Sequence, residues 1–116
     1  MYYYSLRISI TNIKQIEAVN SILRIKSNYP EAGWGLEIVK DDNELGLNFI
    51  DYFLSIIEGK SSQLKNINIT DDDISIWVLY EYQDQCNLEF TSTDLKKIGN
   101  AGVSLCISCW ERVNEQ

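Results

Sequence analysis

The stretch from Ile74 to Tyr82 constrains the fold of this chain more than any other. Isoleucine, valine and tyrosine alternate along it with serine, tryptophan, leucine and glutamate, so both faces of a strand would carry bulky groups. Such a strand is typical of the interior of a sheet that is covered on both faces. Polar residues follow, and then a second alternating run from Cys86 to Phe90. The two runs predict an antiparallel hairpin.

The rest of the chain predicts further strands and helices that complete an α+β fold. Alternation of apolar and polar residues predicts strands at 3–10, 34–39 and 103–110. Helical spacing predicts helices at 13–24 and 45–58, and a short one after a Thr91–Asp94 cap. The segment 61–73 is expected to be a polar connection. The order βαβ-α-ββαβ predicts one domain over residues 1–116, a two-layer sandwich with a ferredoxin-like, mixed or antiparallel sheet and helices on one face.

Composition and the N-terminal sequence indicate a soluble protein. The 116 residues contain no apolar run that approaches the ~20 residues needed to span a membrane. The opening sequence lacks the basic start, apolar core and cleavage site of a signal peptide. We therefore expect a cytoplasmic protein with no membrane partner.

The three cysteines do not form a disulfide framework, because their number is odd in a short chain. Cys106 and Cys109 have the CxxC spacing, but residues three apart on a strand point to opposite faces. We therefore expect buried, inert thiols rather than a zinc or redox site.

Charge favours some partners over others. Seventeen acidic against ten basic residues give a formal net charge of −7, which disfavours direct binding to nucleic acid. The excess suits a basic protein partner, although it also serves solubility alone.

No catalytic constellation is evident in the sequence. Histidine is absent, which excludes the usual triads and removes the commonest metal ligand. No glycine-rich loop has the spacing or following helix of a phosphate site. We expect no catalytic residues and no cofactor.

Three consecutive carboxylates, Asp71 to Asp73, are the strongest candidate for a cation site, alone or with Glu81 or Asp84. Adjacent residues do not converge on one ion without a special loop, so we expect no bound metal. The same carboxylates would serve as a solvated strand entry or as an acidic contact patch.

Tyrosines cluster on the strands expected to begin and centre the sheet, among them Tyr80 and Tyr82. Tyrosine is enriched at protein interfaces, because it offers contact area with a polar tip and little entropy to lose. Cross-strand pairing on a half-solvated sheet is the alternative.

Four segments taken together resemble a known family: Tyr4–Ile8, Trp34–Leu36, Ile74–Val78 and Ala101–Ser108. They are similar to short bacterial proteins of unknown function, in which an aromatic-Ser-hydrophobic-Arg strand opens the chain and a Gly-x-Ser-x-x-Ile-Ser-like strand closes it. No enzymatic activity is established for that family. The resemblance implies similarity to the immunity proteins that bacteria make against toxins, including those of contact-dependent inhibition systems.

Two hypotheses follow. In the first, the chain is not an enzyme but an immunity protein that binds the C-terminal domain of a cognate toxin, a basic nuclease. Its expected contact residues are Asp41, Asp42, Glu44, Asp71, Asp72, Asp73, Tyr80 and Tyr82. In the second, it is a small-ligand or metal-dependent enzyme that uses the Asp71–Asp73 region. The oligomeric state stays open.

Overall fold

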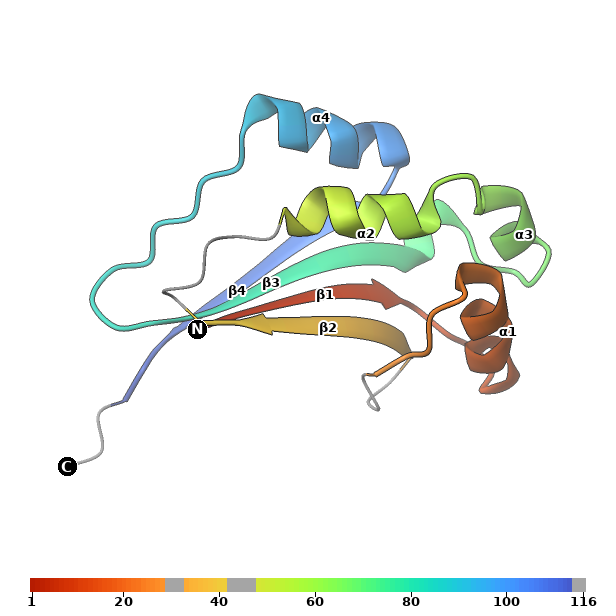
Figure 1. The fold of residues 1–116 in the computed structure, drawn as a ribbon, viewed down its shortest axis with the longest axis horizontal. Helices are drawn as coiled ribbons and strands as arrows, with labels where there is room; N and C mark the ends of the chain where they lie inside the picture. Colours follow the sequence, from red (N-terminus) through yellow and green to blue (C-terminus); the bar gives the residue numbers. More distant parts are fainter. Residues whose placement is uncertain (29–32, 42–47, 114–116) are drawn as a thin grey trace.

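A computed structural model describes residues 1–28, 33–41 and 48–113, and in these residues a four-stranded mixed sheet packs against helices (Figure 1). The strands are β1 (Tyr2–Ile8), β2 (Trp34–Lys40), β3 (Ile74–Tyr82) and β4 (Ser104–Glu111). The helices are α1 (Lys14–Leu23), α2 (Phe49–Ile57), α3 (Ser61–Lys65) and α4 (Ser92–Ala101), with a 3₁₀ turn at Asp71–Asp73. The predicted α+β class is confirmed.

The strand order in the sheet is β2-β1-β3-β4. β1 runs antiparallel to both β2 and β3, whereas β4 runs parallel to β3. Leu6 of β1 is in register with Leu36 and Ile76, and these three side chains point toward the helices. The prediction that β3 is interior is confirmed, because a strand pairs with it on either side.

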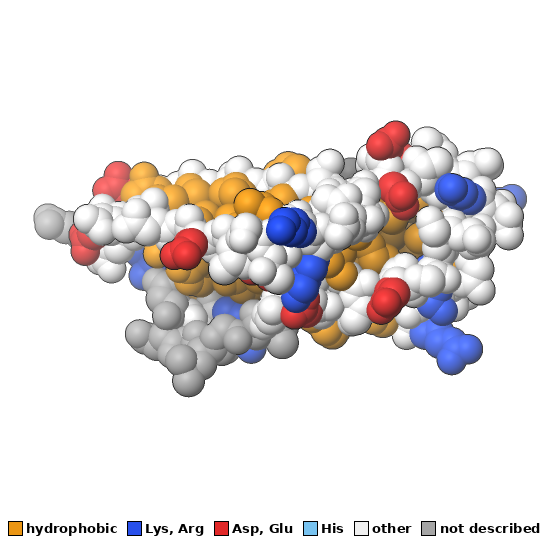
Figure 2. Space-filling model, turned by 90° about the horizontal axis from the view of Figure 1, so that it is seen from above, with side chains coloured by type: hydrophobic (Ala, Val, Ile, Leu, Met, Phe, Trp, Pro, Cys, Tyr) orange, Lys and Arg blue, Asp and Glu red, His pale blue; other side chains and the backbone are white. Residues whose placement is uncertain are grey.

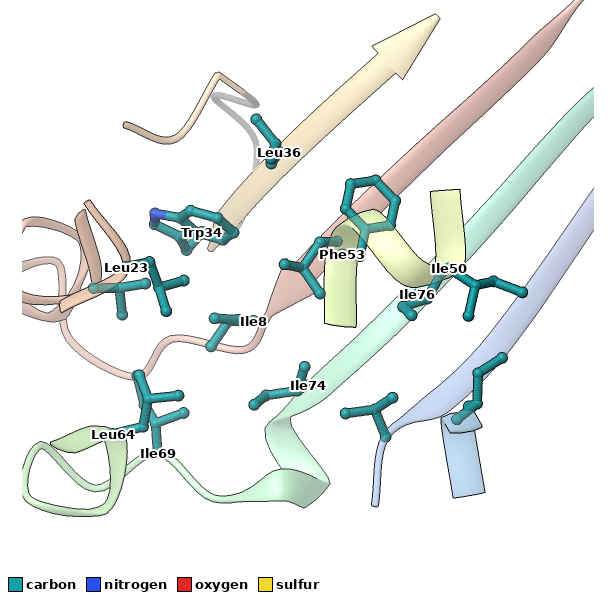
Figure 3. Close-up of a cluster of buried hydrophobic side chains, with 14 residues drawn as sticks. Ile8, Leu23, Trp34, Leu36, Ile50, Phe53, Leu64, Ile69, Ile74 and Ile76 are labelled. Carbon is teal, nitrogen blue, oxygen red and sulfur yellow. The ribbon is translucent and has the colours of Figure 1, made fainter. Parts of the chain in front are cut away.

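The hydrophobic core lies between the sheet and the helices. Ile50 and Phe53, on the inner side of α2, are buried over the sheet (Figure 3). At one end of the sheet, Figure 3 shows Ile8 and Trp34 beside residues of α1 and of the segment that precedes β3. Burying each large apolar side chain contributes roughly 1.5–3 kcal/mol, so this layer holds the helices on one face.

The ends of α4 follow the sequence signals, whereas α2 begins at Phe49, four residues after the predicted start. The Thr91 side chain accepts a hydrogen bond from the backbone N–H of Asp94 at 3.1 Å and begins α4, as predicted. Gly102, with φ of 73°, ends α4 in the left-handed conformation that glycine adopts at least cost. Asn48 caps α2 in the same way as Thr91 caps α4.

The predicted hairpin is wrong, because residues 83–91 form no strand. The antiparallel partner of β3 is β1, which supplies seven paired residues, whereas the 86–90 run offers three apolar positions. Phe90 instead packs edge-on against Phe49 of α2, with ring centres 6.5 Å apart. This removes one strand from the predicted ferredoxin-like order.

The second correction concerns the segment 61–73, which we expected to be a polar connection. It contains α3 and the 3₁₀ turn. Leu64 and Ile69 are both buried against the core, and this burial stabilises a helix too short to persist alone. The observed order is therefore βαβααβαβ.

Candidate protein-binding surface

One face of the sheet carries no helix in the part of the chain that the structure describes (Figure 1). Side chains on this open face alternate with the core residues along each strand. They include three aromatic rings, from Tyr3, Trp77 and Trp110, together with Leu79 and Val39. Trp110 is 38% exposed and Val39 is 48% exposed. Apolar and aromatic groups thus reach solvent on neighbouring strands.

Trp77 lies near the middle of the open face and is held by polar neighbours. Its indole N–H donates to the Ser75 hydroxyl at 2.9 Å. The guanidinium of Arg7 lies over the ring, 4.5 Å from its centre, and the Arg7 Nε donates to Ser5 at 3.0 Å. The ring is therefore fixed in orientation although it is only half-buried.

Trp110 belongs to a second polar network at the end of the open face. Its indole N–H donates to a Glu81 carboxylate oxygen at 3.3 Å, and Arg112 donates to the other oxygen at 2.7 Å. The hydrogen bond from Arg112 is the main cause that lowers the pKa of Glu81. The Tyr3 ring stacks near Trp110, with centres 6.0 Å apart. Glu81 thus orients both a tryptophan and an arginine.

The predicted contact residues do not form one site. Asp41 directly follows β2, at the end of the sheet where Tyr80 lies. Asp71, Asp72 and Asp73 precede β3 at the opposite end. Tyr80 follows Ile74 by six positions, which is ~20 Å of extended strand, so the two groups are separate. Asp42 and Glu44 lie outside the described residues.

Tyr80 and Tyr82 lie on the helix side of the sheet and pair with other rings. Tyr80 stacks on Tyr2 with centres 4.2 Å apart, and Tyr4 stacks on Phe49 at the same separation. Tyr82 is tilted against Tyr80 at 6.3 Å. Cross-strand pairing, one of the two alternatives, is therefore present for Tyr80.

The three consecutive carboxylates differ in their surroundings. Asp73 accepts a hydrogen bond from the Thr70 backbone N–H at 3.0 Å and completes a capping box. Asp71 packs against Gly102, where an added Cβ would lie 3.1 Å from its carboxylate. Asp72 is exposed. Within the described residues, no three potential ligands are grouped to hold a metal ion.

A pocket of about 610 Å³ lies between α2, α3 and α4, and Asp71 is on its wall. Leu54, Ile57 and Leu64 contribute apolar lining. Lys97 and Asp51, also in the lining, form an ion pair at 2.8 Å that raises the pKa of Lys97. Figure 2 views the molecule from this helix side and shows hydrophobic atoms at the surface between acidic and basic side chains. The pocket therefore has a mixed character.

The cysteines differ from expectation, because Cys86 and Cys109 are exposed rather than buried. Their sulfur atoms lie 2.9 Å apart, and the contact raises the pKa of the Cys109 thiol. Cys106 points to the other face of β4, as its spacing predicted. The pairing of Cys86 with Cys109 was not foreseen, since it depends on the path of residues 83–91.

Helices on one face of the sheet were expected, but the rings that the open face carries were not foreseen. Trp77 and Trp110 are the residues concerned, and neither was named as a contact. The contact of Arg7 with Trp77 was not foreseen either. The available signal was the position of Trp77, which alternates with the most apolar residues of β3.

Comparison of the chain with protein-family models, with curated proteins and with solved structures finds no match. Among the described helices, none has the length and apolar character needed to cross a membrane.

Proposed function

We propose that this chain is an immunity protein, which binds the C-terminal domain of a cognate bacterial toxin and neutralises it. The observation that carries the proposal is the open sheet face with its half-exposed rings, Trp77 and Trp110. Tryptophan and tyrosine are the residues that most often anchor protein interfaces, and their rings here have polar groups around them. A partner that covers this face would bury those rings.

The open face is also prepared for binding. Arg7 and Ser75 hold Trp77, and Glu81 holds Trp110, so little side-chain freedom remains to be lost when a partner binds. Loss of rotamer freedom opposes association by about 0.5–1.5 kcal/mol for each mobile side chain. Fixed aromatic anchors therefore favour a tight complex.

Charge and sequence resemblance support the class of partner. The net charge of −7 complements a basic domain, and complementary charge speeds encounter and excludes wrong partners. Many toxins opposed by immunity proteins are basic nucleases, which suits this sign of charge. Such an immunity protein acts in the cytoplasm, where a nuclease reaches nucleic acid, and it needs no cofactor or catalytic residue of its own.

The test is to measure binding to the C-terminal domain of the cognate toxin. Trp110→Ala should weaken the affinity by about 30-fold, the effect of losing one interface anchor of about 2 kcal/mol. Tyr52→Ala is the matched control, because Tyr52 is equally exposed, at 38%, but lies on α2 at the helix side. The affinity of the Tyr52→Ala variant for the toxin domain should stay within about twofold of that of the unchanged protein.

Two outcomes would count against the proposal. If the unchanged protein neither binds the toxin domain nor protects cells from it, the immunity role is wrong. If Tyr52→Ala weakens binding and Trp110→Ala does not, the partner binds the helix side and the open face is not the site.

A small-ligand function is the second candidate, and the pocket beside Asp71 favours it. Asp51, Glu58 and Asp71 contribute three carboxylates to this pocket against the single ammonium of Lys97, which suits a small amine. Titration with butylamine, followed by amide NMR shifts, tests this function. Saturable NMR shifts around the pocket, abolished by Asp71→Asn, would support the small-ligand function. The absence of such shifts would exclude it.

A further inference from the structure

The two edge strands of the sheet differ in what covers them. The outer edge of β2 is covered at Gly35 and Glu37 by the segment that follows α1. Asn28 donates its backbone N–H to the Gly35 carbonyl at 2.9 Å, and its side-chain amide bonds both the N–H and the carbonyl of Glu37. Ser27 accepts a hydrogen bond from Gly35 N–H at 3.0 Å. These contacts use the backbone groups that another strand would need.

In the described part of the chain, no hydrogen bond covers the backbone at the outer edge of β4, although the Cys86 sulfur lies 2.9 Å from that of Cys109. The Arg112 N–H donates to the Tyr82 carbonyl at 2.7 Å, so it points toward β3. Because backbone groups alternate in direction along a strand, those of Leu105, Ile107 and Cys109 point away from β3. Among the described residues, no hydrogen bond from another segment reaches these outward groups.

Most of β4 also lacks the features that keep edge strands apart. Edge strands are commonly protected by charged side chains, proline or bulges. From Val103 to Trp110 the sequence contains neither a charged residue nor a proline. Ile107, at the centre of this run, is 48% exposed on the helix side. An uncharged edge with an exposed β-branched side chain is suited to pairing with another strand.

We propose that β4 pairs antiparallel with β4 of a second copy of this chain, about a two-fold axis at Ile107. In this register Ile107 faces Ile107 of the second copy, and Leu105 faces Cys109 of the second copy. All three are residues whose backbone groups point outward, so each facing pair exchanges two hydrogen bonds. The helix-side rows of the two strands become continuous, and the exposed Ile107 side chains cover each other.

Charge and backbone geometry favour a second copy in this register. The paired run is uncharged, so no like charges face each other although each copy carries −7. Glu111 falls opposite Val103 of the second copy instead of another acid. The Val103 N–H already donates to the Ile98 carbonyl at 3.4 Å, which marks the natural end of the pairing. The open sheet face stays free, so this inference does not depend on the immunity function.

Light scattering with size-exclusion chromatography, over a concentration series, tests the dimer. The unchanged protein should reach twice the chain mass of 13.4 kDa, and Ile107→Lys should raise the dissociation constant at least about tenfold. Val39→Lys is the matched control, because Val39 is also 48% exposed but lies on β2, at the other edge of the sheet. It should leave the dimer unchanged.

Salt gives a second readout. Raising the salt from ~0.15 M toward 1 M shortens the Debye length from ~8 to ~3 Å and screens the repulsion between two acidic copies. Dimerisation should therefore strengthen with salt. A protein that stays monomeric at every concentration and salt level overturns the proposal, and so does a dimer that Ile107→Lys leaves intact.

The register is tested by cross-linking. Ile107→Cys is placed in a variant whose Cys86, Cys106 and Cys109 are serine, and oxidised glutathione accepts the two electrons and two protons released by the paired thiols. Facing residues of a hydrogen-bonded pair have Cα atoms ~5.5 Å apart, within the range of a disulfide. Ile107→Cys should give a covalent dimer, whereas Val39→Cys in the same background should form no covalent cross-link. Equal cross-linking of the two variants would overturn the register.

Discussion

The Arg7 guanidinium lies 4.5 Å from the centre of the Trp77 ring, and the pair joins β1 to β3 on the uncovered face of the sheet. A cation over an indole ring at an exposed site is worth about 0.5–1 kcal/mol. The contact therefore orients the ring more than it stabilises the fold. Trp77 is on the surface of the molecule that is available to a partner, while the core is built on the other face.

Replacing Trp77 should cost less than replacing a tryptophan of the core. Full burial would give a loss of about 3–5 kcal/mol on truncation to alanine, but Trp77 is half-buried, so Trp77→Ala should cost about 1–2 kcal/mol. Trp34 is only 1% exposed, so Trp34→Ala should lower the free energy of unfolding by the full amount of about 3–5 kcal/mol. Urea unfolding of both variants measures the difference. Equal losses would mean that Trp77 is part of the core.

The cap of α4 offers a local test of the fold. Thr91→Ala removes the acceptor for the Asp94 N–H and should lower the free energy of unfolding by about 1 kcal/mol. Thr91→Ser keeps the hydroxyl and should restore most of the stability. Thermal or urea unfolding gives the comparison. If both variants lose the same amount, the threonine methyl group matters rather than the hydrogen bond.

Much of the fold could be predicted because its signals are local. Short stretches of sequence are enough to predict the Thr91 cap, the end of α4 at Gly102 and the apolar positions of α2. The interior position of β3 followed from bulky residues on both its faces. The partner of β3 did not follow, because pairing with β1 joins residues about seventy apart in the sequence.

The surface was harder to predict than the fold. Alternation separates Trp77 from Ile76 and Val78, but it does not say which face the helices cover. That choice depends on where α2 packs. Which acidic residues contact the partner was left open, because sequence alone gives no distance between Asp41 and Asp71. The sheet places them at opposite ends.

Glu81 gives a prediction about pH. Its pKa is lowered in the folded protein, chiefly by the hydrogen bond from Arg112. A lowered pKa contributes stability above the ordinary value of the carboxyl group, and that contribution is lost as the pH falls through the folded-state pKa. Arg112→Gln should therefore raise the Glu81 pKa toward its ordinary value. The free energy of unfolding should then depend less on pH in the acid range.

Side-chain carboxyl NMR titration measures the Glu81 pKa directly, and urea unfolding at a series of acid pH values measures the stability. In a Glu81→Gln background, Arg112→Gln should change the pH dependence no further, because the titrating partner is gone. A Glu81 pKa that is the same with and without Arg112 would contradict the assignment.

The acidic ends of the sheet should affect how fast a basic partner arrives. Asp71 and Asp72 are exposed at one end, and Asp41 is exposed at the other, ~20 Å away along the strands. Charges on the rim of an interface mostly set the association rate. Asp71→Asn with Asp72→Asn, made together, should slow association with the toxin domain at low salt. Asp73 is left unchanged because it caps the turn before β3.

The salt dependence separates encounter from structural damage. The slowing should shrink as the salt rises from ~0.15 M toward 1 M and the Debye length falls from ~8 to ~3 Å, whereas dissociation should stay constant. Since ~20 Å exceeds the Debye length, the effects of the Asp71–Asp72 pair and of Asp41→Asn should add when combined. Stopped-flow mixing measures both rates. If the Asp71–Asp72 variant associates at the unchanged rate at low salt, that end of the sheet takes no part in the encounter. If only Asp41→Asn slows association, the partner approaches at the other end, beside Tyr80.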